Sequence, residues 1–478
     1  MSTTLPADAL VVFGITGDLA KKMTFRALYR LEARKKLDCP IVGVAIDEWS
    51  LEQLRRHARD SIEASVKEPD DDVLDRLTAR ISYVQGDYAE PDTFKRVADA
   101  VGAAAGEVRS PVFYLEVPPA LFCPVVKGLS EVGLTDNGRV VIEKPFGHDL
   151  ESARQLNAEL HELLREDQIL RIDHYLGKEP VMDIAYLRFA NSMLEPVWNR
   201  EHVSHVQTTI AEDFGVEDRG RFYDAVGAMR DVIQNHALQV LSLIAMEPPA
   251  GNQPDSVRDK KLELFKAVRA ADPARYVRGQ YEGFREVPDV APDSTTETFA
   301  AIELAIDNWR WSGVPFFVRA GKNLPVKASE VTVVFKRPPK LGIGPGRLPE
   351  PNQLTVRIEP TPGARIRLFA KQAGEETFEP ADLEVLFEKV AGEEPEPYER
   401  LLGDALAGRA QLFTREDAVE ETWRIVQPLL DEPGPVHPYP AGTWGPEAAE
   451  SLTRGICNWF EPWLPGPSAA LESGVLGF

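Results

Sequence analysis

The alternation of short apolar segments with helical segments over the first 150 residues constrains the fold of this chain most. Strand-like segments lie at residues 9–13, 41–46, 112–115 and 139–142, and helix-like segments lie at 24–36, 51–66 and 120–132. Strands that alternate with helices in this way indicate a parallel sheet with crossover helices. The N-terminal part is therefore predicted to be an α/β, doubly wound, Rossmann-like domain.

The pattern changes after about residue 180. Longer, partly alternating segments at residues 203–210, 298–305 and 331–336 favour antiparallel strands with one covered face. Proline-rich stretches at 338–351 and 433–440 are predicted to be loops. A chain of 478 residues is too long for one ordinary core. We therefore expect a second, α+β domain with a large, mostly antiparallel sheet.

Composition and charge limit the partners and the location. A formal net charge of −22 argues against nucleic acid and anionic membranes as partners. Cys39, Cys123 and Cys457 are too far apart for a disulfide framework or a metal motif, so no metal centre is expected. The first residues lack the basic and apolar regions of a secretory signal, and no apolar run is long enough to span a membrane. A cytoplasmic location is expected.

A glycine turn follows the first predicted strand. Its residues Gly14, Thr16, Gly17, Asp18 and Leu19 resemble a shortened dinucleotide fingerprint. Glycines let a backbone approach a pyrophosphate, and the helix that follows offers N–H donors and a positive dipole end. A Gly-x-x-Gly turn alone is common in proteins, so the position after a strand gives it its weight.

The segment 171–179 (RIDHYLGKE) packs an acid, an imidazole and an ammonium into six residues. If the chain turns helically after His174, then His174 and Lys178 stand at i and i+4 on one face, with Asp173 beside them. Gly177 indicates a close backbone approach or a tight bend. The alternative is a surface cluster of salt bridges.

Three further segments carry candidate functional groups, each with a simpler structural alternative. Lys144 follows a predicted parallel strand, at the edge where doubly wound sheets bind ligands, or it is an exposed lysine in a turn. His236, near Asp231, suits a general base or is a core histidine. Lys322 and Lys327 follow another strand-like run and are either positioned cations or surface lysines.

These pieces, in this order, resemble the glucose-6-phosphate dehydrogenase family over almost the whole chain. The matching blocks are 14–20 (GITGDLA), 114–119 (YLEVPP), 143–147 (EKPFG), 171–179, 215–236, 278–281 (RGQY), 310–315 (RWSGVP) and 444–446 (WGP). The Asp-His-Tyr-Leu-Gly-Lys block is highly specific to that family. The resemblance implies a dinucleotide-binding domain over residues 1–175 and a β+α substrate-binding and oligomerisation domain over 176–478. It also implies a homodimer or homotetramer.

The resemblance also implies a role for each candidate residue in oxidising glucose 6-phosphate at C1. His236 falls on the general base and Asp173 on the group that orients it. His174 and Lys178, with Lys327 close, fall on the phosphate site. Glu212, Asp231 and Lys322 fall on positions that hold the sugar, and Lys144 falls between nicotinamide and substrate.

Departures from the family pattern concern the cofactor first. The second strand usually ends in an arginine that grips the 2′-phosphate of NADP, whereas here Ile46 is followed by Asp47. The family implies NADP, but Asp47 suits ribose hydroxyls and repels a phosphate, so NAD is expected to serve at least as well as NADP. Glu359 replaces a common glutamine, and Met182 and Asp183 replace a frequent Gln-Asn pair.

Two alternative functions remain open at this point. One is a related dehydrogenase for another 6-anionic glucose, such as a sulfosugar, because a sulfonate uses the same donors. The other is a catalytically silent homologue that regulates a sister enzyme. A silent homologue should have lost its base or its phosphate donors, and this chain has lost neither.

Overall fold

The computed structural model describes residues 5–251, 253–339, 350–375, 377–387 and 395–465. The chain forms two compact units, and each is described by itself. The first contains the residues through Glu179 together with Pro249–Leu262 and Pro395–Glu420. The second contains Pro180–Pro248, Glu263–Glu394 and the residues from Glu421 onward.

The first unit is built on a six-stranded parallel sheet with the order β3-β2-β1-β4-β5-β6. The strands are β1 (Leu10–Phe13), β2 (Ile41–Ala45), β3 (Ile81–Gln85), β4 (Val112–Leu115), β5 (Arg139–Ile142) and β6 (Ile169–Arg171). This order is that of a Rossmann-type sheet. Successive strands are added on one side of β1 as far as β3, and then on its other side from β4 onward. The predicted doubly wound domain is confirmed.

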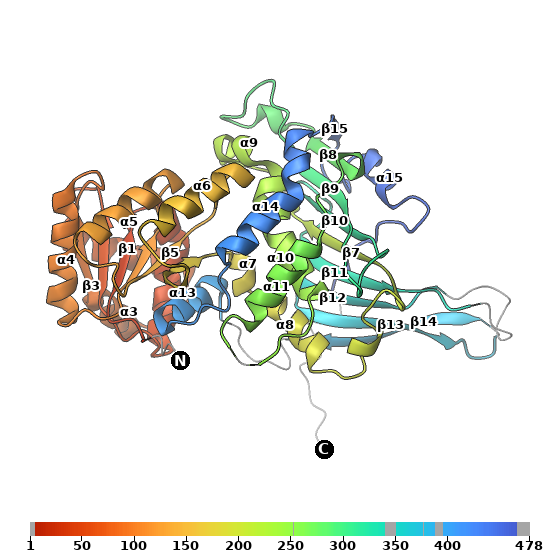
Figure 1. Ribbon diagram of the computed structural model, residues 1–478, viewed down its shortest axis with the longest axis horizontal. Helices are drawn as coiled ribbons and strands as arrows, with labels where there is room; N and C mark the ends of the chain where they lie inside the picture. The colour runs from red at the N-terminus through yellow and green to blue at the C-terminus, as the bar shows by residue number, and fades with distance from the viewer. Residues whose placement is uncertain (1–4, 252, 340–349, 376, 388–394, 466–478) are drawn as a thin grey trace, which may run out of the picture. The chain divides into compact units, whose positions relative to one another are not determined.

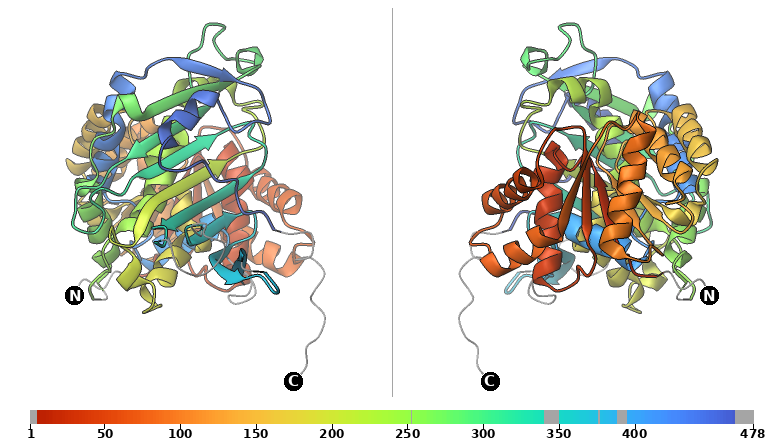
Figure 2. Two further views of the ribbon diagram at one scale, coloured as in Figure 1. Left: turned by 90° about the vertical axis from the view of Figure 1, so that its right-hand side faces the viewer. Right: turned by 90° about the vertical axis from the view of Figure 1, so that its left-hand side faces the viewer.

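Helices cover both faces of this sheet, as the right-hand view in Figure 2 shows. They are α1 (Phe25–Ala33), α2 (Leu51–Ser65), α3 (Asp71–Arg80), α4 (Pro91–Ala105), α5 (Phe122–Glu131) and α6 (Leu150–His161). Strands β1, β2, β4 and β5 are buried at every position, as expected for strands covered on two faces. A late segment, α13 (Pro397–Ala407), also packs in this unit, against α1 and α7 (His174–Gly177).

The second unit is built on a nine-stranded sheet with the order β14-β13-β12-β11-β7-β10-β9-β8-β15 (Figures 1 and 2). Its strands are β7 (Val203–Ala211), β8 (Tyr276–Tyr281), β9 (Phe299–Leu304), β10 (Phe316–Gly321), β11 (Ala328–Phe335), β12 (Gln353–Glu359), β13 (Gly363–Lys371), β14 (Phe378–Leu386) and β15 (Val436–Tyr439). Only β7–β10 and β8–β15 pair in parallel. The predicted large, mostly antiparallel sheet is confirmed.

A π-helix, η5 (Met229–Ala237), packs against β7, β9 and β10 of this sheet. It lies between α9 (Gly220–Ala228) and α10 (Leu238–Ala245). The other helices are α8 (Glu179–Phe189), α11 (Ser256–Ala267), α14 (Glu416–Asp431) and the short α15 (Glu450–Thr453), of which α8, α11 and α14 begin in the first unit. Across the described residues, no helix is both long enough and apolar enough to cross a membrane.

Two sequence predictions need correction. Helical structure after the glycine turn begins at Asp18 rather than at residue 24, passes through a π-helical stretch, η1 (Ala20–Thr24), and ends at Ala33. Residues 436–439, predicted as a loop, form strand β15, where Pro438 is tolerated because β15 is an edge strand. Of the other predicted loop, residues 340–349 lie outside the described part of the chain.

Candidate functional site

The glycine turn after β1 passes close to the backbone that follows β4. Gly14 has a φ of +84°, and a Cβ added there would lie 2.3 Å from the backbone oxygen of Glu116. The Gly17 amide donates to the Gly14 carbonyl at 2.8 Å, which closes the turn just before the helix begins at Asp18. Position 14 therefore requires glycine, and the first amides of the helix lie next to the carboxyl end of β1.

The end of β2 presents an acid toward this turn. The Thr16 hydroxyl donates to Asp47 Oδ2 at 2.6 Å, so the Asp47 side chain faces the glycine turn. The Tyr83 hydroxyl donates to the Asp47 backbone carbonyl at 2.6 Å, which holds the loop in place. Ile46 is 62% exposed and offers no charge. The direction of the Asp47 carboxylate, which the sequence left open, is thus compatible with a bond to a ribose hydroxyl.

Lys144 leaves the carboxyl end of β5, directly after the buried Glu143. Glu143 Oε1 accepts from the Tyr114 hydroxyl at 2.7 Å, and its Oε2 accepts from the Tyr398 hydroxyl at 3.5 Å. Burial raises the pKa of Glu143 to about 7, although both hydroxyls and the Lys144 charge oppose the shift. The Lys144–Pro145 peptide bond is cis.

A second buried carboxyl, Glu116, follows the neighbouring strand β4. Burial is the main cause that raises its pKa from 4.5 to about 8, and the charge of Glu143 adds to the rise. Its Oε1 accepts from the Thr24 hydroxyl, while Oε2 is buried without a hydrogen-bond partner among the described residues. The Glu116 carboxyl therefore holds its proton more tightly than an exposed glutamate does.

Replacing Glu116 by glutamine should change how the stability of the protein depends on pH. A carboxyl whose folded pKa lies above its unfolded value stabilises the fold below about pH 4.5, and that contribution is lost as pH rises through about 8. The wild-type protein should lose at most about 5 kcal/mol of stability between those limits through this group, and Glu116→Gln should abolish that loss. Urea unfolding at about pH 5 and about pH 9 measures it, with the exposed Glu131→Gln as control. An unchanged pH dependence in Glu116→Gln would contradict the assignment.

The segment after β6 places the Asp173–Lys178 group in the first unit. Asp173 is 4% exposed and caps α7 by accepting from the Tyr175 amide at 3.0 Å. The helix ends at Gly177, and Lys178 is extended, with its Nζ 4.0 Å from the centroid of the Tyr175 ring. The chain therefore turns helically after His174, as the prediction required, and the shared face of His174 and Lys178 stays a prediction.

Gly177 does mark a close approach, as its position suggested. A Cβ on Gly177 would lie 2.7 Å from the Pro397 carbonyl oxygen and 2.9 Å from Leu401 Cδ1, both on α13. Contact at these distances leaves no space for a side chain. The glycine lets α13 pack directly on α7.

In the second unit, three candidate residues converge at one edge of the large sheet. Glu212 follows β7, Lys322 follows β10 and Lys327 precedes β11. In the register of the sheet, Ala211 pairs with both Gly321 and Ala328, so the three residues leave the sheet at the same place. This convergence could not be read from their separate positions in the sequence.

Charges at this edge are paired and partly covered. Lys322 is 8% exposed and forms an ion pair with Glu212, with 2.5 Å between Nζ and Oε2. The same Nζ lies 5.0 and 5.1 Å from the ring centroids of Phe214 and Tyr223. Burial raises the pKa of the Tyr223 phenol well above 10, and the nearby charges of Asp231 and Glu212 add to the rise. Asp231 therefore belongs to the same cluster.

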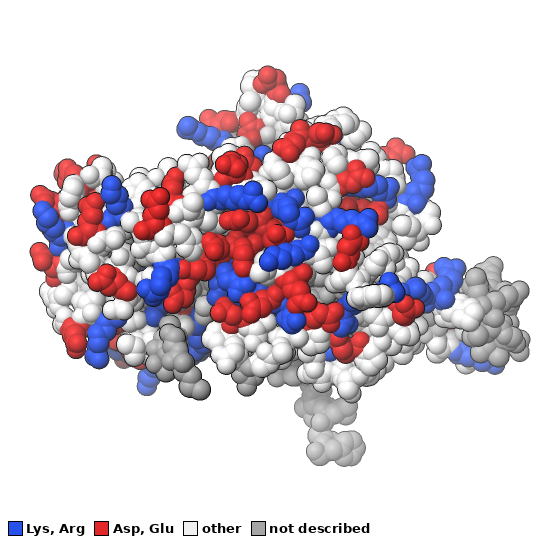
Figure 3. Space-filling model, in the orientation of Figure 1, with Lys and Arg blue, Asp and Glu red and all other residues white. Residues whose placement is uncertain are grey.

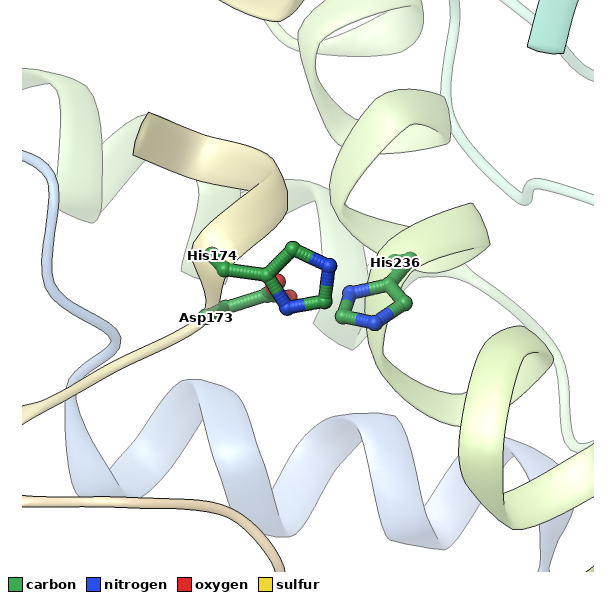
Figure 4. A group of neighbouring side chains, drawn as sticks. All are labelled: Asp173, His174 and His236. Carbon is green, nitrogen blue, oxygen red and sulfur yellow. The ribbon is translucent and has the colours of Figure 1, made fainter. Parts of the chain in front are cut away.

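His236 lies on η5 and is 3% exposed. Figure 4 shows its imidazole projecting from η5, and it shows Asp173 and His174 at the start of α7. The π-helical form of η5 is notable because such turns are often found at functional sites. The predicted site residues thus fall into two groups: one on the glycine turn, β2, β5 and α7 of the first unit, and one on the sheet edge and η5 of the second.

Glu359 and the Met182–Asp183 pair, the two departures from the family pattern near the predicted substrate site, lie on β12 and α8. Lys327 is about half exposed, and its Nζ lies 3.9 Å from Glu359 Oε2. Glu359 therefore adds a negative charge beside a predicted phosphate ligand. Met182 is buried in α8, and Asp183 follows it on the same helix.

Two residues of the first unit lie near the candidate site without a motif that marks them in the sequence. Tyr398 lies in α13, more than 200 residues from the groups that it contacts. Lys261, in α11, is 5% exposed; burial lowers its pKa to about 7, and the charge of Asp173 opposes that shift. Lys261 stands in the charged run 258–261 (RDKK), which is typical of an exposed helix face, and no motif surrounds Tyr398, so no local signal identifies either residue.

Another cluster in the first unit offers metal-ligand atoms. His161, Glu166 and Glu416 each place one such atom within 4.8 Å of the others. Arg171 Nη1 donates to both carboxylate oxygens of Glu166, at 2.8 and 2.9 Å, and His161 Nε2 lies 2.5 Å from Glu416 Oε2. The arrangement is that of an ion-pair network between α6 and the start of α14. Figure 3 shows a similar mixing of acidic and basic side chains over the visible face.

Comparisons with known proteins agree over nearly the whole chain. Residues 11–183 match the model of the glucose-6-phosphate dehydrogenase NAD binding domain, and residues 185–460 match that of the C-terminal domain. The chain is 55% identical to glucose-6-phosphate 1-dehydrogenase 1 of Mycobacterium tuberculosis, over 96% of this chain and 97% of that protein. It is 37% identical to glucose-6-phosphate 1-dehydrogenase of Dickeya dadantii, over 96% and 99%.

Solved structures extend the agreement to three dimensions. The crystal structure of glucose-6-phosphate 1-dehydrogenase from Mycobacterium avium matches with a TM-score of 0.91 and 54% identity, covering 97% of this chain and all of that one. A glucose-6-phosphate dehydrogenase in complex with its substrate glucose-6-phosphate matches with a TM-score of 0.88 and 35% identity, covering 96% and 100%. From these matches and from its two domains, the chain belongs to the glucose-6-phosphate dehydrogenase family.

Proposed function

We propose that the chain oxidises glucose 6-phosphate at C1 to 6-phosphoglucono-1,5-lactone, the first step of the oxidative pentose phosphate pathway. The observation that carries the proposal is the convergence of Glu212, Lys322 and Lys327 at one sheet edge. It is supported by 55% identity to curated glucose-6-phosphate 1-dehydrogenases. A relative at 35% identity is a complex with glucose 6-phosphate itself.

The first unit fits a nicotinamide dinucleotide. Gly14 lets the turn lie directly against the Glu116 backbone, and the helix that begins at Asp18 has its first amides at the same end of the sheet, where a pyrophosphate is proposed to bind. Thr16, Gly17 and Leu19 complete the proposed binding turn. When bound, the nicotinamide accepts the hydride that leaves C1.

We assign the proton transfer to His236. The imidazole takes the proton of the C1 hydroxyl as the C1–H bond breaks, so the carbon is oxidised and the histidine becomes an imidazolium. Asp173 is assigned the role of orienting that imidazole and stabilising its positive charge. Lys144 is assigned a place beside the nicotinamide and the substrate.

The remaining residues hold the substrate. We assign the phosphate to His174, Lys178 and Lys327, because cationic donors form strong, charge-assisted hydrogen bonds to phosphate oxygens. Glu212, Asp231 and Lys322 are assigned to the sugar hydroxyls and ring. Holding both ends of the sugar fixes C1 relative to the base, which is the main contribution of binding to such a reaction.

The close relatives support the phosphate ester over the other functions that the sequence left open. A sulfosugar dehydrogenase and a silent regulator have no support among the relatives reported above, all of which are named for glucose 6-phosphate. The base and the phosphate donors are all present.

Isotope transfer tests the proposed reaction directly. With glucose 6-phosphate carrying deuterium at C1, the label should appear on C4 of the reduced nicotinamide, and the lactone should be the first product. Deuterium that is released to water, or transfer that proceeds equally well from unphosphorylated glucose, would contradict the proposal.

We further propose that NAD serves at least as well as NADP. Asp47 faces the glycine turn through its hydrogen bond with Thr16, where a carboxylate accepts from ribose hydroxyls and repels a 2′-phosphate. Ile46 offers no compensating charge. Lys21 and Lys22, exposed on η1 just after the turn, are the cations that would compete with this effect of Asp47.

Restoring the usual cation should change cofactor preference. Ile46→Arg combined with Asp47→Ala should shift the ratio of kcat/KM values toward NADP by about 5–150-fold, equivalent to about 1–3 kcal/mol for one charge-assisted contact. Initial rates with each nucleotide measure the ratio. Glu48→Ala, which removes an exposed acid one residue further on, is the matched control and should leave the ratio unchanged.

Assembly, domain roles and location remain proposals. We propose a homodimer or homotetramer, supported by exposed Leu368, Leu383 and Val385 on the edge hairpin β13–β14. Residues 1–175 are proposed to bind the dinucleotide, and residues 176–478 to bind substrate and to oligomerise. The cytoplasm remains the proposed location, supported by three free cysteines that suit a reducing compartment. Light scattering on the full chain tests the assembly.

A further inference from the structure

Two buried carboxyl groups and two tyrosines form one network at the carboxyl end of the parallel sheet. Leu115 and Ile142 are paired across β4 and β5, so Glu116 and Glu143, the residues that follow them, leave neighbouring strand ends. The Tyr114 hydroxyl donates to Glu143 Oε1 at 2.7 Å; burial raises the pKa of this phenol, and the nearby charge of Glu116 adds to the rise. Glu143 is thereby tied to the strand beside its own.

A third element holds Glu143 from the other side. Tyr398, on α13, donates to Glu143 Oε2 at 3.5 Å. Burial raises the pKa of the Tyr398 phenol, and the charges of Glu143, Glu116 and Asp173 add to the rise in that order. The same hydroxyl therefore lies close to Glu143 and within electrostatic reach of Asp173. All of these residues belong to the first unit.

The position of Glu143 in the chain gives this network a consequence for the reaction. Its backbone continues directly into Lys144, whose side chain is partly buried. With both carboxyl oxygens held by hydroxyls from different elements, the Glu143 side chain has one orientation, and the backbone that leads to Lys144 is fixed with it. Displacing a positioned group by about 1 Å can reduce turnover about a hundredfold.

We propose that Glu143 is a positioning residue that acts through Lys144, anchored by the hydroxyls of Tyr114 and Tyr398. The inference rests on the proposed role of Lys144 beside nicotinamide and substrate. In this role Glu143 needs the size of its side chain and its two hydrogen bonds, and it does not need a negative charge. The charged and titratable groups around it are Glu116 on β4's exit, Lys144 on its own turn, and Tyr114 and Tyr398.

Comparing kcat and KM of two variants of the full-length enzyme, Glu143→Ala and Glu143→Gln, tests whether the hydrogen bonds of Glu143 matter. Glu143→Ala removes both hydrogen bonds and should lower kcat about tenfold or more, with a much smaller change in KM for glucose 6-phosphate. Glu143→Gln keeps an acceptor for Tyr114 and offers an N–H donor to the Tyr398 oxygen, so it should stay within about threefold of wild type. A glutamine variant as impaired as the alanine variant would overturn the anchoring role.

A double-mutant cycle shows whether Glu143 acts through its neighbour. If it does, Glu143→Ala added to Lys144→Ala should cause no further loss of kcat, because the group being positioned is already gone. Losses that multiply would overturn the inference and assign Glu143 a separate or merely structural role. A Lys144→Ala variant with normal turnover would instead remove Lys144 from the proposed function, which distinguishes the two failures.

Two conservative variants keep the test valid if Glu143→Ala does not fold. Tyr114→Phe and Tyr398→Phe each remove one hydroxyl from the network and leave the ring in place. Each should lower kcat by a smaller factor than Glu143→Ala, and each loss should disappear in the Lys144→Ala background. Full activity in both tyrosine variants would contradict the proposal.

Discussion

His236→Asn should lower the turnover number on glucose 6-phosphate by about a hundredfold or more, the usual scale for losing a positioned general base. The imidazole lies on a π-helical segment against the large sheet and is 3% exposed, so its position is set by packing. Asparagine keeps polarity and comparable size but takes no proton. Because the phosphate and hydroxyl contacts remain, KM for the sugar should change little.

Steady-state kinetics at neutral pH measure this effect, and another buried histidine of the same unit supplies the control. His205, on β7, packs against Phe317 and Phe460, and burial lowers its pKa to about 4. His205→Asn should therefore retain turnover even if it reduces stability. Near-normal turnover in His236→Asn would remove His236 from the mechanism.

Lys178→Ala and His174→Ala should each raise KM for glucose 6-phosphate by about 10–150-fold, the effect of losing one hydrogen bond to a charged group at about 1.5–3 kcal/mol. Both residues lie on the segment that follows β6, and the Lys178 ammonium makes a cation–π contact with the Tyr175 ring. The turnover number should fall less, since the phosphate is remote from C1.

Unphosphorylated glucose separates phosphate binding from other roles. It lacks the group that Lys178 and His174 are proposed to hold, so kcat/KM for glucose should respond far less to either substitution. Lys95→Ala, which removes an exposed lysine of α4, is the matched control for loss of a cation. Equal losses on glucose and on glucose 6-phosphate would show that the two residues act elsewhere.

A strand could be predicted from the sequence where its residues form a continuous apolar run. Strands β1, β2, β4 and β5 are continuous apolar runs, buried on both faces, and were all predicted. β3 and β6 are shorter or less apolar and were missed. Strand β15 was missed because Pro438 marks a loop in most contexts, and only its edge position in the sheet makes it acceptable.

The site was predictable where a motif is contiguous and unpredictable where it is assembled by folding. The glycine turn and the Asp173–Lys178 group are each one short segment, so their residue types alone indicated phosphate chemistry. The helical turn that begins at His174 was predicted, whereas its end at Gly177, where α13 packs too closely for a side chain, depends on a distant segment.

Contacts between distant segments left no trace in the local sequence. Tyr398 reaches Glu143 across 255 positions, and the convergence of Glu212 with Lys322 depends on sheet register across 110. The direction of the Asp47 side chain likewise followed only from its hydrogen bond with Thr16. Tertiary pairing decides such features, and residue spacing carries no information about them.

Initial rates on glucose 6-phosphate with NAD and NADP in parallel test the central claim most directly. Reduction of the nicotinamide should require glucose 6-phosphate, yield the lactone, and proceed with NAD at least as efficiently as with NADP. No reduction with either nucleotide would contradict the proposed reaction. Activity that favours NADP by about a hundredfold in kcat/KM, about 2.7 kcal/mol, would keep the reaction but contradict the role given to Ile46 and Asp47.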